Sequence, residues 1–184
     1  MCGIVGFIGG NQAKDVILRG LKRLEYRGYD SAGLSLYNEK YRVFDVYKDV
    51  GRVDKLMAST KSSQPSYLGL GHTRWATHGK VTKINSHPHY SQTRRFIIVH
   101  NGVIENYEQL KEQYLRQSTF LSETDTEVIA QLIETFSTSL SVETAITTTL
   151  KLLKGSYALL VLDSLNPDRI YAAKYKSPLL IGKG

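Results

Sequence analysis

The single cysteine of the chain, Cys2, stands directly behind the initiator Met1. Cytosolic processing removes an initiator methionine when the next residue is small, so the mature chain would begin with a thiol and a free α-amine on one residue. An α-amine titrates at about 7.7–8.0 and can deprotonate a thiol near neutral pH. The position predicts either an N-terminal nucleophile that carries its own base, or the small buried hydrophobic residue that free cysteines usually are.

A long polar segment, 73–93, contains residue types suited to binding. Segments of this length in a compact domain are usually functional or disordered. Arg74 could fork a carboxylate or phosphate, and Trp75 could cover a bound group as an apolar lid. His72 and His78 could be ligands or acid–base groups. The alternative is a structural loop with polar caps. Because the segment has no Cys, Asp or Glu, we expect no metal site.

Two further positions allow two interpretations each. Asn101-Gly102 is a strong hairpin signal, but an Asn amide and a Gly N–H at one turn are also two convergent donors for an oxyanion. Asp125 fits the first turn of a helix, where its charge is favourable, and it could equally bind a substrate ammonium group.

Composition narrows the class of protein. The 184 residues carry a net charge of +7, are 41% hydrophobic and contain one Cys, which is typical of a single globular domain in a reducing, cytoplasmic setting. The longest apolar run is 157–162, too short to span a membrane, and 1–10 lacks the basic start of a signal peptide. Basic residues are spread out, with pairs as the longest runs, so nucleic-acid binding is not favoured.

The elements that must position these residues follow from hydrophobic periodicity. Strands are predicted at 3–8, 32–37, 41–47, 67–72, 95–100, 157–163, 169–174 and 178–182. Helices are predicted from Ala13 to about Arg27, at 53–59 and 107–117, after Thr124 to Phe136, and from Ser141 to Leu153. Capping boxes are expected at Asn106/Gln109 and Thr124/Glu127. Hairpin-like groups of strands and clustered helices indicate an α+β fold with antiparallel sheets, without a domain linker.

Several motifs occur together and in order along the chain. They are CGIVG (2–6), RLEYRGYDSAG (23–33), HTRWATHG (72–79), NSHPH (85–89), HNGVIENY (100–107) and SETDTEVIA (122–130). In this combination the sequence resembles class II glutamine amidotransferase domains, and most closely the glutaminase domains of the glucosamine-6-phosphate synthase type. For the purine-pathway type we would expect RGQESAG-like and RYST-like stretches instead.

The resemblance implies a fold and a reaction. The fold is the N-terminal nucleophile hydrolase sandwich, with two antiparallel sheets between helical layers (αββα). Cys2 would attack the glutamine side-chain amide, Asn101 and the Gly102 N–H would hold the oxyanion, and the α-amine would take the thiol proton. The ammonia released would serve the amination of fructose 6-phosphate to glucosamine 6-phosphate in the full-length enzyme.

The resemblance also assigns the glutamine pocket. Arg74, Thr77 and His78 map onto it, with Arg74 forking the α-carboxylate. Asp125 would receive the α-ammonium, and Gly102 would line the pocket as well.

Three residues acquire supporting roles from the same resemblance. Arg27 maps to a conformational support near the nucleophile and Trp75 to the gate of the ammonia route. His87 maps to a receiver of signals from the sugar domain.

Residues 2–184 would form one glutaminase domain, truncated at its C-terminus and without the sugar-isomerase domain that receives the ammonia. L-glutamine is the expected substrate, no cofactor, metal, nucleic acid or membrane is expected, and the full-length enzyme would be a homodimer. Two other interpretations are open: a purine-type amidotransferase, or a non-catalytic regulatory module. The presence of Cys2, Arg74, Asn101, Gly102 and Asp125 argues against the second of these.

Overall fold

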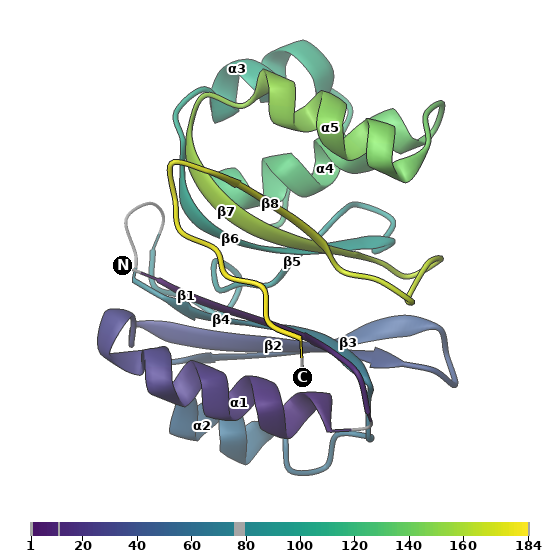
Figure 1. Cartoon of the computed structure of the whole chain (residues 1–184). Helices are drawn as coiled ribbons and strands as arrows, with labels where there is room; N and C mark the ends of the chain where they lie inside the picture. Colours follow the sequence, from purple (N-terminus) through teal and green to yellow (C-terminus); the bar gives the residue numbers. More distant parts are fainter. Residues whose placement is uncertain (1, 11, 76–79, 184) are drawn as a thin grey trace.

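The computed structural model describes residues 2–10, 12–75 and 80–183, and it has four layers. Two antiparallel sheets lie face to face, with helices on the outer face of each (Figure 1). The predicted α+β fold and its αββα layering are therefore confirmed. Thr77 and His78 lie outside the described residues. No described helix is long and apolar enough to cross a membrane.

The first sheet is covered on its outer face by α1 (Ala13–Leu24) and α2 (Val53–Ser59) (Figure 1). Its strands, in order across the sheet, are β1 (Gly3–Ile8), β4 (Leu68–Arg74), β2 (Ser31–Asn38) and β3 (Val43–Val50). A short 3₁₀ turn, η1 (Glu25–Arg27), follows α1. The register of β1 on β4 pairs Gly3 with Thr73, which brings the start of the chain beside the end of β4.

The second sheet has three helices on its outer face: α3 (Tyr107–Tyr114), α4 (Asp125–Ser137) and α5 (Val142–Leu152) (Figure 1). Its strands, in order, are β5 (His89–Tyr90), β6 (Phe96–Ile104), β7 (Gly155–Asp163) and β8 (Tyr171–Tyr175). The last residue of β6, Ile104, donates a hydrogen bond from its N–H to Asp125 in the first turn of α4, so the end of β6 lies beside the start of that helix.

Three hydrophobic clusters hold the layers together. One lies between α1, α2 and the first sheet, and another between the second sheet and its three helices. A third joins the sheets to each other and includes Leu70, Val99 and Leu160. At one point the sheets approach too closely for any side chain: a Cβ on Gly33 would lie 1.9 Å from the carbonyl oxygen of His87. This glycine lets the segment before β5 lie directly on β2.

The structure corrects four local predictions. Segment 178–182 is not a strand, since Pro178 has no N–H to donate and Leu180 and Ile181 are almost fully exposed. Asn101-Gly102 is not a hairpin turn, because β6 continues through it to Ile104.

The two capping boxes are also absent from the described hydrogen bonds. The side chain of Asn106 instead contacts Leu152 and Lys154, while Glu127 accepts hydrogen bonds from Leu121 and Ser122. Ser141 does cap α5, with its side chain accepting from Thr144 N.

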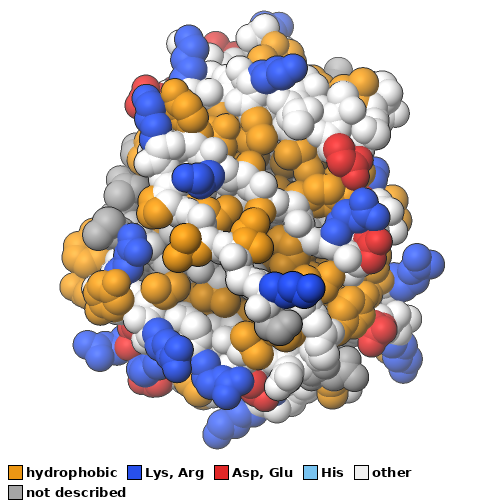
Figure 2. Space-filling model, in the orientation of Figure 1, with side chains coloured by type: hydrophobic (Ala, Val, Ile, Leu, Met, Phe, Trp, Pro, Cys, Tyr) orange, Lys and Arg blue, Asp and Glu red, His pale blue; other side chains and the backbone are white. Residues whose placement is uncertain are grey.

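The face seen in Figure 2 has hydrophobic side chains along its middle, with Lys and Arg spread around them. A groove of about 790 Å³ lies there, between β1 and residues near β8, and residues 179–182 line one side of it.

Candidate active site

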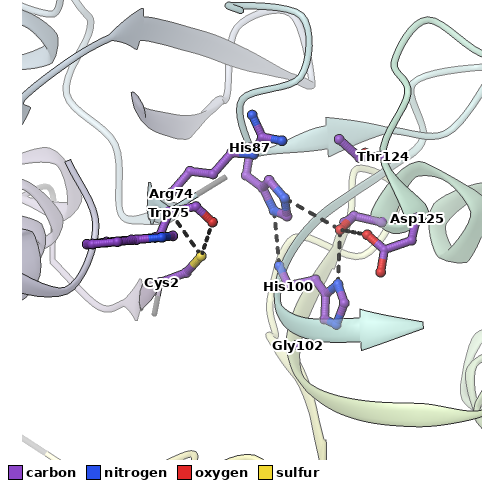
Figure 3. A pocket seen from close by; sticks show the side chains of 9 residues that line it. Cys2, Arg74, Trp75, His87, His100, Gly102, Thr124 and Asp125 are labelled. Atoms are coloured by element: carbon purple, nitrogen blue, oxygen red, sulfur yellow. Dashed lines mark hydrogen bonds between the residues drawn. The ribbon is translucent and has the colours of Figure 1, made fainter. Parts of the chain in front are cut away.

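The predicted site residues converge where both sheets end on the same side of the molecule. Cys2 precedes β1, Arg74 ends β4, Gly102 lies in β6 and Asp125 begins α4 (Figure 3). They line a small cavity of about 30 Å³. The other residues lining it are Trp75, His87, His100, Thr124 and Thr126.

The thiol of Cys2 is held by the main chain of Trp75. The N–H of Trp75 donates to Sγ at 3.2 Å, and Sγ lies 3.5 Å from the carbonyl oxygen of the same residue (Figure 3). Burial raises the pKa of the Cys2 thiol above its ordinary value, although the Trp75 N–H and the charge of Arg74 act in the opposite direction. At neutral pH the group is thus a thiol, which needs a base before it can act as a nucleophile.

Asn101 and Gly102 lie beside Cys2 although the chain separates them widely. The Asn101 amide nitrogen donates to the main-chain carbonyl of Cys2 at 3.0 Å. Gly102 has φ +136°, and a Cβ there would lie 2.0 Å from the carbonyl oxygen of Ser156 on β7. Only glycine fits this backbone without strain, so the position is fixed by the strand pairing rather than by a turn.

Opposite charges line the cavity. Arg74 is 4% exposed, and its guanidinium donates to the carbonyl oxygen of Lys80 at 3.1 Å. Burial lowers the pKa of Arg74, while the negative charges of Asp30 and Asp125 act to raise it. The Asp125 carboxylate accepts from the N–H of Ile104 at 2.7 Å, which ties the first turn of α4 to the end of β6. This arrangement fits a zwitterion, with a carboxylate at one end and an ammonium at the other.

Residues from separate motifs hold this pocket in shape. The Asn85 amide donates to the carbonyl oxygen of Lys80 and to the Glu123 carboxylate, and it accepts from the Glu123 N–H at 3.0 Å. Lys80 O is also the acceptor for Arg74. The segment before α4 is therefore linked to the segment that follows β4, and the carbonyl that binds Arg74 is held by the same contacts.

Four of the five histidines are buried: His72, His87, His89 and His100. The rings of the first three form a cluster, whereas His100 lies on the helix-covered face of the second sheet, with its Nδ1 atom 3.0 Å from the Thr126 hydroxyl. The rings of His72 and His87 are stacked at 4.0 Å, and that of His89 meets His87 edge-on at 4.7 Å. Burial lowers the pKa of His72 to about 3 and lowers the pKa of the others as well. Within the described part of the chain, no group of His, Cys, Asp and Glu is arranged to hold a metal ion.

Trp75 lies between two cavities. The residue is 42% exposed, and its ring meets that of Tyr29 edge-on, with the ring centroids 5.4 Å apart. Besides the small cavity, it lines a larger one of about 460 Å³, together with Cys2, Arg27 and Asn101. Arg27 therefore lines only the larger of these two cavities, whereas Arg74 and Asp125 line only the smaller one.

Three pocket residues were not singled out from the sequence: His100, Thr124 and Thr126. The two threonines flank Asp125, and their hydroxyls contact His89 and His100 respectively. A polar residue on each side of a first-turn aspartate is the signal that could have pointed to them, but Thr124 was interpreted only as part of a capping box. His100 directly precedes Asn101 and could have been found by that adjacency.

Comparison with solved structures defines the class of protein. Glutamine phosphoribosylpyrophosphate amidotransferase from B. subtilis, complexed with ADP and GMP, matches with a TM-score of 0.76 and 28% identity, over 89% of this chain and 35% of that one. An allosteric regulatory enzyme of purine biosynthesis matches with a TM-score of 0.77 and 28% identity, over 89% and 36%. The fold is that of the N-terminal nucleophile hydrolase amidotransferases.

Comparison of sequences gives the family. Residues 58–173 match the glutamine amidotransferase domain. The chain belongs to this family, in its class II branch. It is 58% identical over its whole length to glutamine–fructose-6-phosphate aminotransferase (isomerizing) of Bacillus thuringiensis subsp. konkukian (strain 97-27), and 56% identical to that of Listeria monocytogenes serovar 1/2a (strain ATCC BAA-679 / EGD-e). It spans 30% of the length of each of these relatives.

Proposed function

We propose that residues 2–184 form a domain that hydrolyses L-glutamine to L-glutamate and ammonia, with Cys2 as the nucleophile. The observation that carries the proposal is the contact of the Asn101 amide with the main chain of Cys2, beside a cavity lined by Arg74 and Asp125. A thiol, an oxyanion donor and a pair of opposite charges are the groups that hydrolysis of an amino-acid side-chain amide needs.

The chemistry proceeds through a thioester. The α-amine of a processed Cys2 takes the thiol proton, and Sγ attacks the side-chain carbonyl carbon of glutamine. The negative charge that develops on the carbonyl oxygen is stabilised by the Asn101 amide and the Gly102 N–H. The proton passes to the leaving nitrogen, the C–N bond breaks and ammonia departs. Water then attacks the thioester, which releases glutamate and restores the thiol.

The substrate is held at its other end. Arg74 forks the α-carboxylate and Asp125 accepts the α-ammonium, while Gly102 allows the backbone to approach the substrate closely. Thr77 and His78, carried over from the resemblance, complete the pocket in this proposal. Binding both ends of the zwitterion sets the distance from the α-carbon to the reacting amide, and so selects glutamine over shorter amides such as asparagine.

The ammonia is proposed to aminate fructose 6-phosphate, giving glucosamine 6-phosphate in the full-length enzyme. The relatives named for that reaction are 58% identical, against 28% for the purine-type structures. The acceptor chemistry would belong to the length of those relatives that this chain does not match, namely the sugar-isomerase domain. Homodimer formation by the full-length enzyme and a cytoplasmic location complete the proposal.

Three residues have supporting roles in it. Trp75, which lines both cavities, gates the passage of ammonia from one to the other. Arg27 supports the conformation of the nucleophile from the side of the larger cavity. His87 receives signals from the sugar domain; it is buried against His72 and lines the small cavity.

Intact mass spectrometry with a glutamine-analogue electrophile tests the assignment of Cys2. The wild-type chain should gain the mass of one adduct, mapped to Cys2, and should release ammonia from glutamine. Cys2→Ala should neither gain the adduct nor hydrolyse glutamine, while its circular dichroism and unfolding curve stay close to wild type. Turnover retained by Cys2→Ala would overturn the proposal.

A second assay tests the acceptor. The full-length enzyme is incubated with glutamine and either fructose 6-phosphate or phosphoribosyl pyrophosphate, and the aminated products are measured. Amination of fructose 6-phosphate alone is expected, whereas amination of phosphoribosyl pyrophosphate would assign the chain to the purine type. Glutamate release without amination of either acceptor would contradict the assigned acceptor but not the glutaminase activity.

A further inference from the structure

His72 contacts the side-chain oxygen of Asn101, the proposed oxyanion donor. It lies on β4, two residues before Arg74, and is 1% exposed. Its Nε2 atom is 3.0 Å from the side-chain oxygen of Asn101 and 3.1 Å from the main-chain carbonyl oxygen of His100. A side chain of the first sheet thus contacts Asn101 of the second sheet, the residue whose amide nitrogen donates to Cys2.

Two main-chain carbonyls fix the protons in this chain of contacts. The carbonyl oxygen of His100 can only accept, so Nε2 of His72 must carry a hydrogen. The carbonyl oxygen of Cys2 can also only accept, so the Asn101 atom facing it must be the amide nitrogen. The Asn101 oxygen consequently faces Nε2–H of His72. Each of the three contacts then pairs one N–H donor with one oxygen acceptor.

The imidazole ring of His72 is neutral, and its contacts hold it in one orientation. Burial lowers the pKa of His72 to about 3, and Nδ1 has no hydrogen-bond partner among the described residues. The ring is stacked on His87, at an interplanar angle of 11°. The interpretation of His72 as an acid–base group is therefore not supported, since the ring stays neutral near neutral pH and its Nε2–H is engaged. The interpretation as a metal ligand is not supported either, because no group of His, Cys, Asp and Glu among the described residues could hold a metal ion.

We propose that His72 is a positioning residue that holds the Asn101 amide with an N–H directed at the reacting carbonyl. This inference rests on the proposed glutaminase function. One Asn101 amide hydrogen bonds to Cys2 O, and the other is left for the oxyanion. A half-turn of the amide about its last bond would instead point a lone pair at the developing negative charge. His72 opposes that half-turn, because it would place the Asn101 NH₂ group against Nε2–H.

The test compares two substitutions of His72 in two backgrounds. His72→Gln keeps an N–H donor near the position of Nε2, and His72→Leu removes it. We expect His72→Leu to lower kcat by about tenfold or more, short of the 10²–10³ that loss of an oxyanion donor costs, with KM nearly unchanged. His72→Gln should recover most of the loss.

To distinguish a positioning role from a general structural role, the same His72 substitutions are measured in protein that also carries Asn101→Ala. If His72 acts through the Asn101 amide, His72→Leu should lower kcat little further once that amide is gone. A general structural role predicts the same fold-loss in both backgrounds, and that result would overturn the proposal. His89→Leu is the matched control: it is another buried histidine of the cluster, bonded to Thr124 and not to Asn101, and its effect should be equal in both backgrounds.

A measurement that needs no activity keeps this inference distinct from the glutaminase assignment. In ¹⁵N-histidine-labelled protein, the His72 ring should be neutral with hydrogen on Nε2, and the Asn101 side-chain amide signals should shift in His72→Leu but less in His72→Gln. Hydrogen on Nδ1 instead would overturn the positioning role, even if His72→Leu fails to fold. A wild-type chain that shows the expected ring state but releases no ammonia would contradict the proposed function alone.

Discussion

The side-chain amide of Asn101 donates a hydrogen bond to the main-chain carbonyl of Cys2 at 3.0 Å, across 99 positions of the chain. The contact joins the start of the first sheet to β6 of the second. It places the thiol-bearing residue and the amide in one rigid frame, so their separation does not depend on the conformation of a loop. The consequences for the proposed reaction can be measured residue by residue.

Asn101→Ala should lower kcat far more than it changes KM. An oxyanion donor acts mainly on the transition state, and loss of one costs about 10²–10³ in kcat. Steady-state measurement of glutamate formation checks this. Asn38→Ala, which removes an amide bonded to Asp45 at the far end of β2, is the control and should leave both constants near wild type. A rise in KM alone would make Asn101 a binding residue.

Arg74→Lys should show the opposite bias, with KM for glutamine raised most. Lysine keeps the charge but cannot fork a carboxylate, and the site is buried, so little solvent compensates for the lost bond. The same exchange at the exposed Arg94 should have no effect on KM. An unchanged KM in Arg74→Lys would remove the carboxylate contact from the proposal.

Gly102→Ala should both destabilise the protein and lower activity. The new Cβ would lie 2.0 Å from Ser156 O, at a backbone φ of +136°. We expect the free energy of unfolding to fall by more than about 1 kcal/mol, with kcat reduced because the strand must shift. Denaturant titration measures the free energy of unfolding, and steady-state kinetics measures kcat. Gly182→Ala, where a Cβ would meet nothing within 4 Å, should change neither.

The free energy of unfolding should fall as the pH is lowered below about 6.5. The folded-state pKa of His72 is depressed to about 3, so the unfolded chain binds more protons between these values and the stabilisation is lost as pH falls through that window. One such histidine contributes a slope of about 1.4 kcal/mol per pH unit. Urea titrations at about pH 7.5, 6.5 and 5.5, above the range where carboxylates titrate, measure it. The slope should be smaller in His72→Gln; equal slopes would mean that His72 is not protonated on unfolding.

Retention of Met1 should leave the enzyme inactive. While Met1 is attached, the Cys2 nitrogen is an amide, which cannot accept the thiol proton, and burial already holds the thiol pKa above its usual range. Ammonia release should appear only after an aminopeptidase removes Met1. A chain with a bulky residue before Cys2, which blocks processing, is the comparison. Equal rates in the blocked and Cys2-first forms would rule out the α-amine as the base.

Most of the helices and strands, and the family, could be predicted from the sequence. Periodicity located α1, α2 and α5 and most of the strands, because burial of one face imposes a regular spacing that local sequence records. The ordered motifs identified the amidotransferase family, which the comparisons confirmed. Local sequence left Asn101-Gly102 open between a hairpin turn and a pair of oxyanion donors, and the pairing of β6 with β7 excludes the turn.

The surroundings of individual residues could not be predicted from the sequence, because they depend on how the two sheets pack. His72 is a neutral donor to Asn101 rather than an acid–base group, because the face-to-face sheets exclude water from its ring. Segment 178–182 has the composition of a strand but no partner strand among the described residues. Charge state and strand pairing both depend on neighbours that are distant in the sequence, and packing two sheets together brings those neighbours into contact.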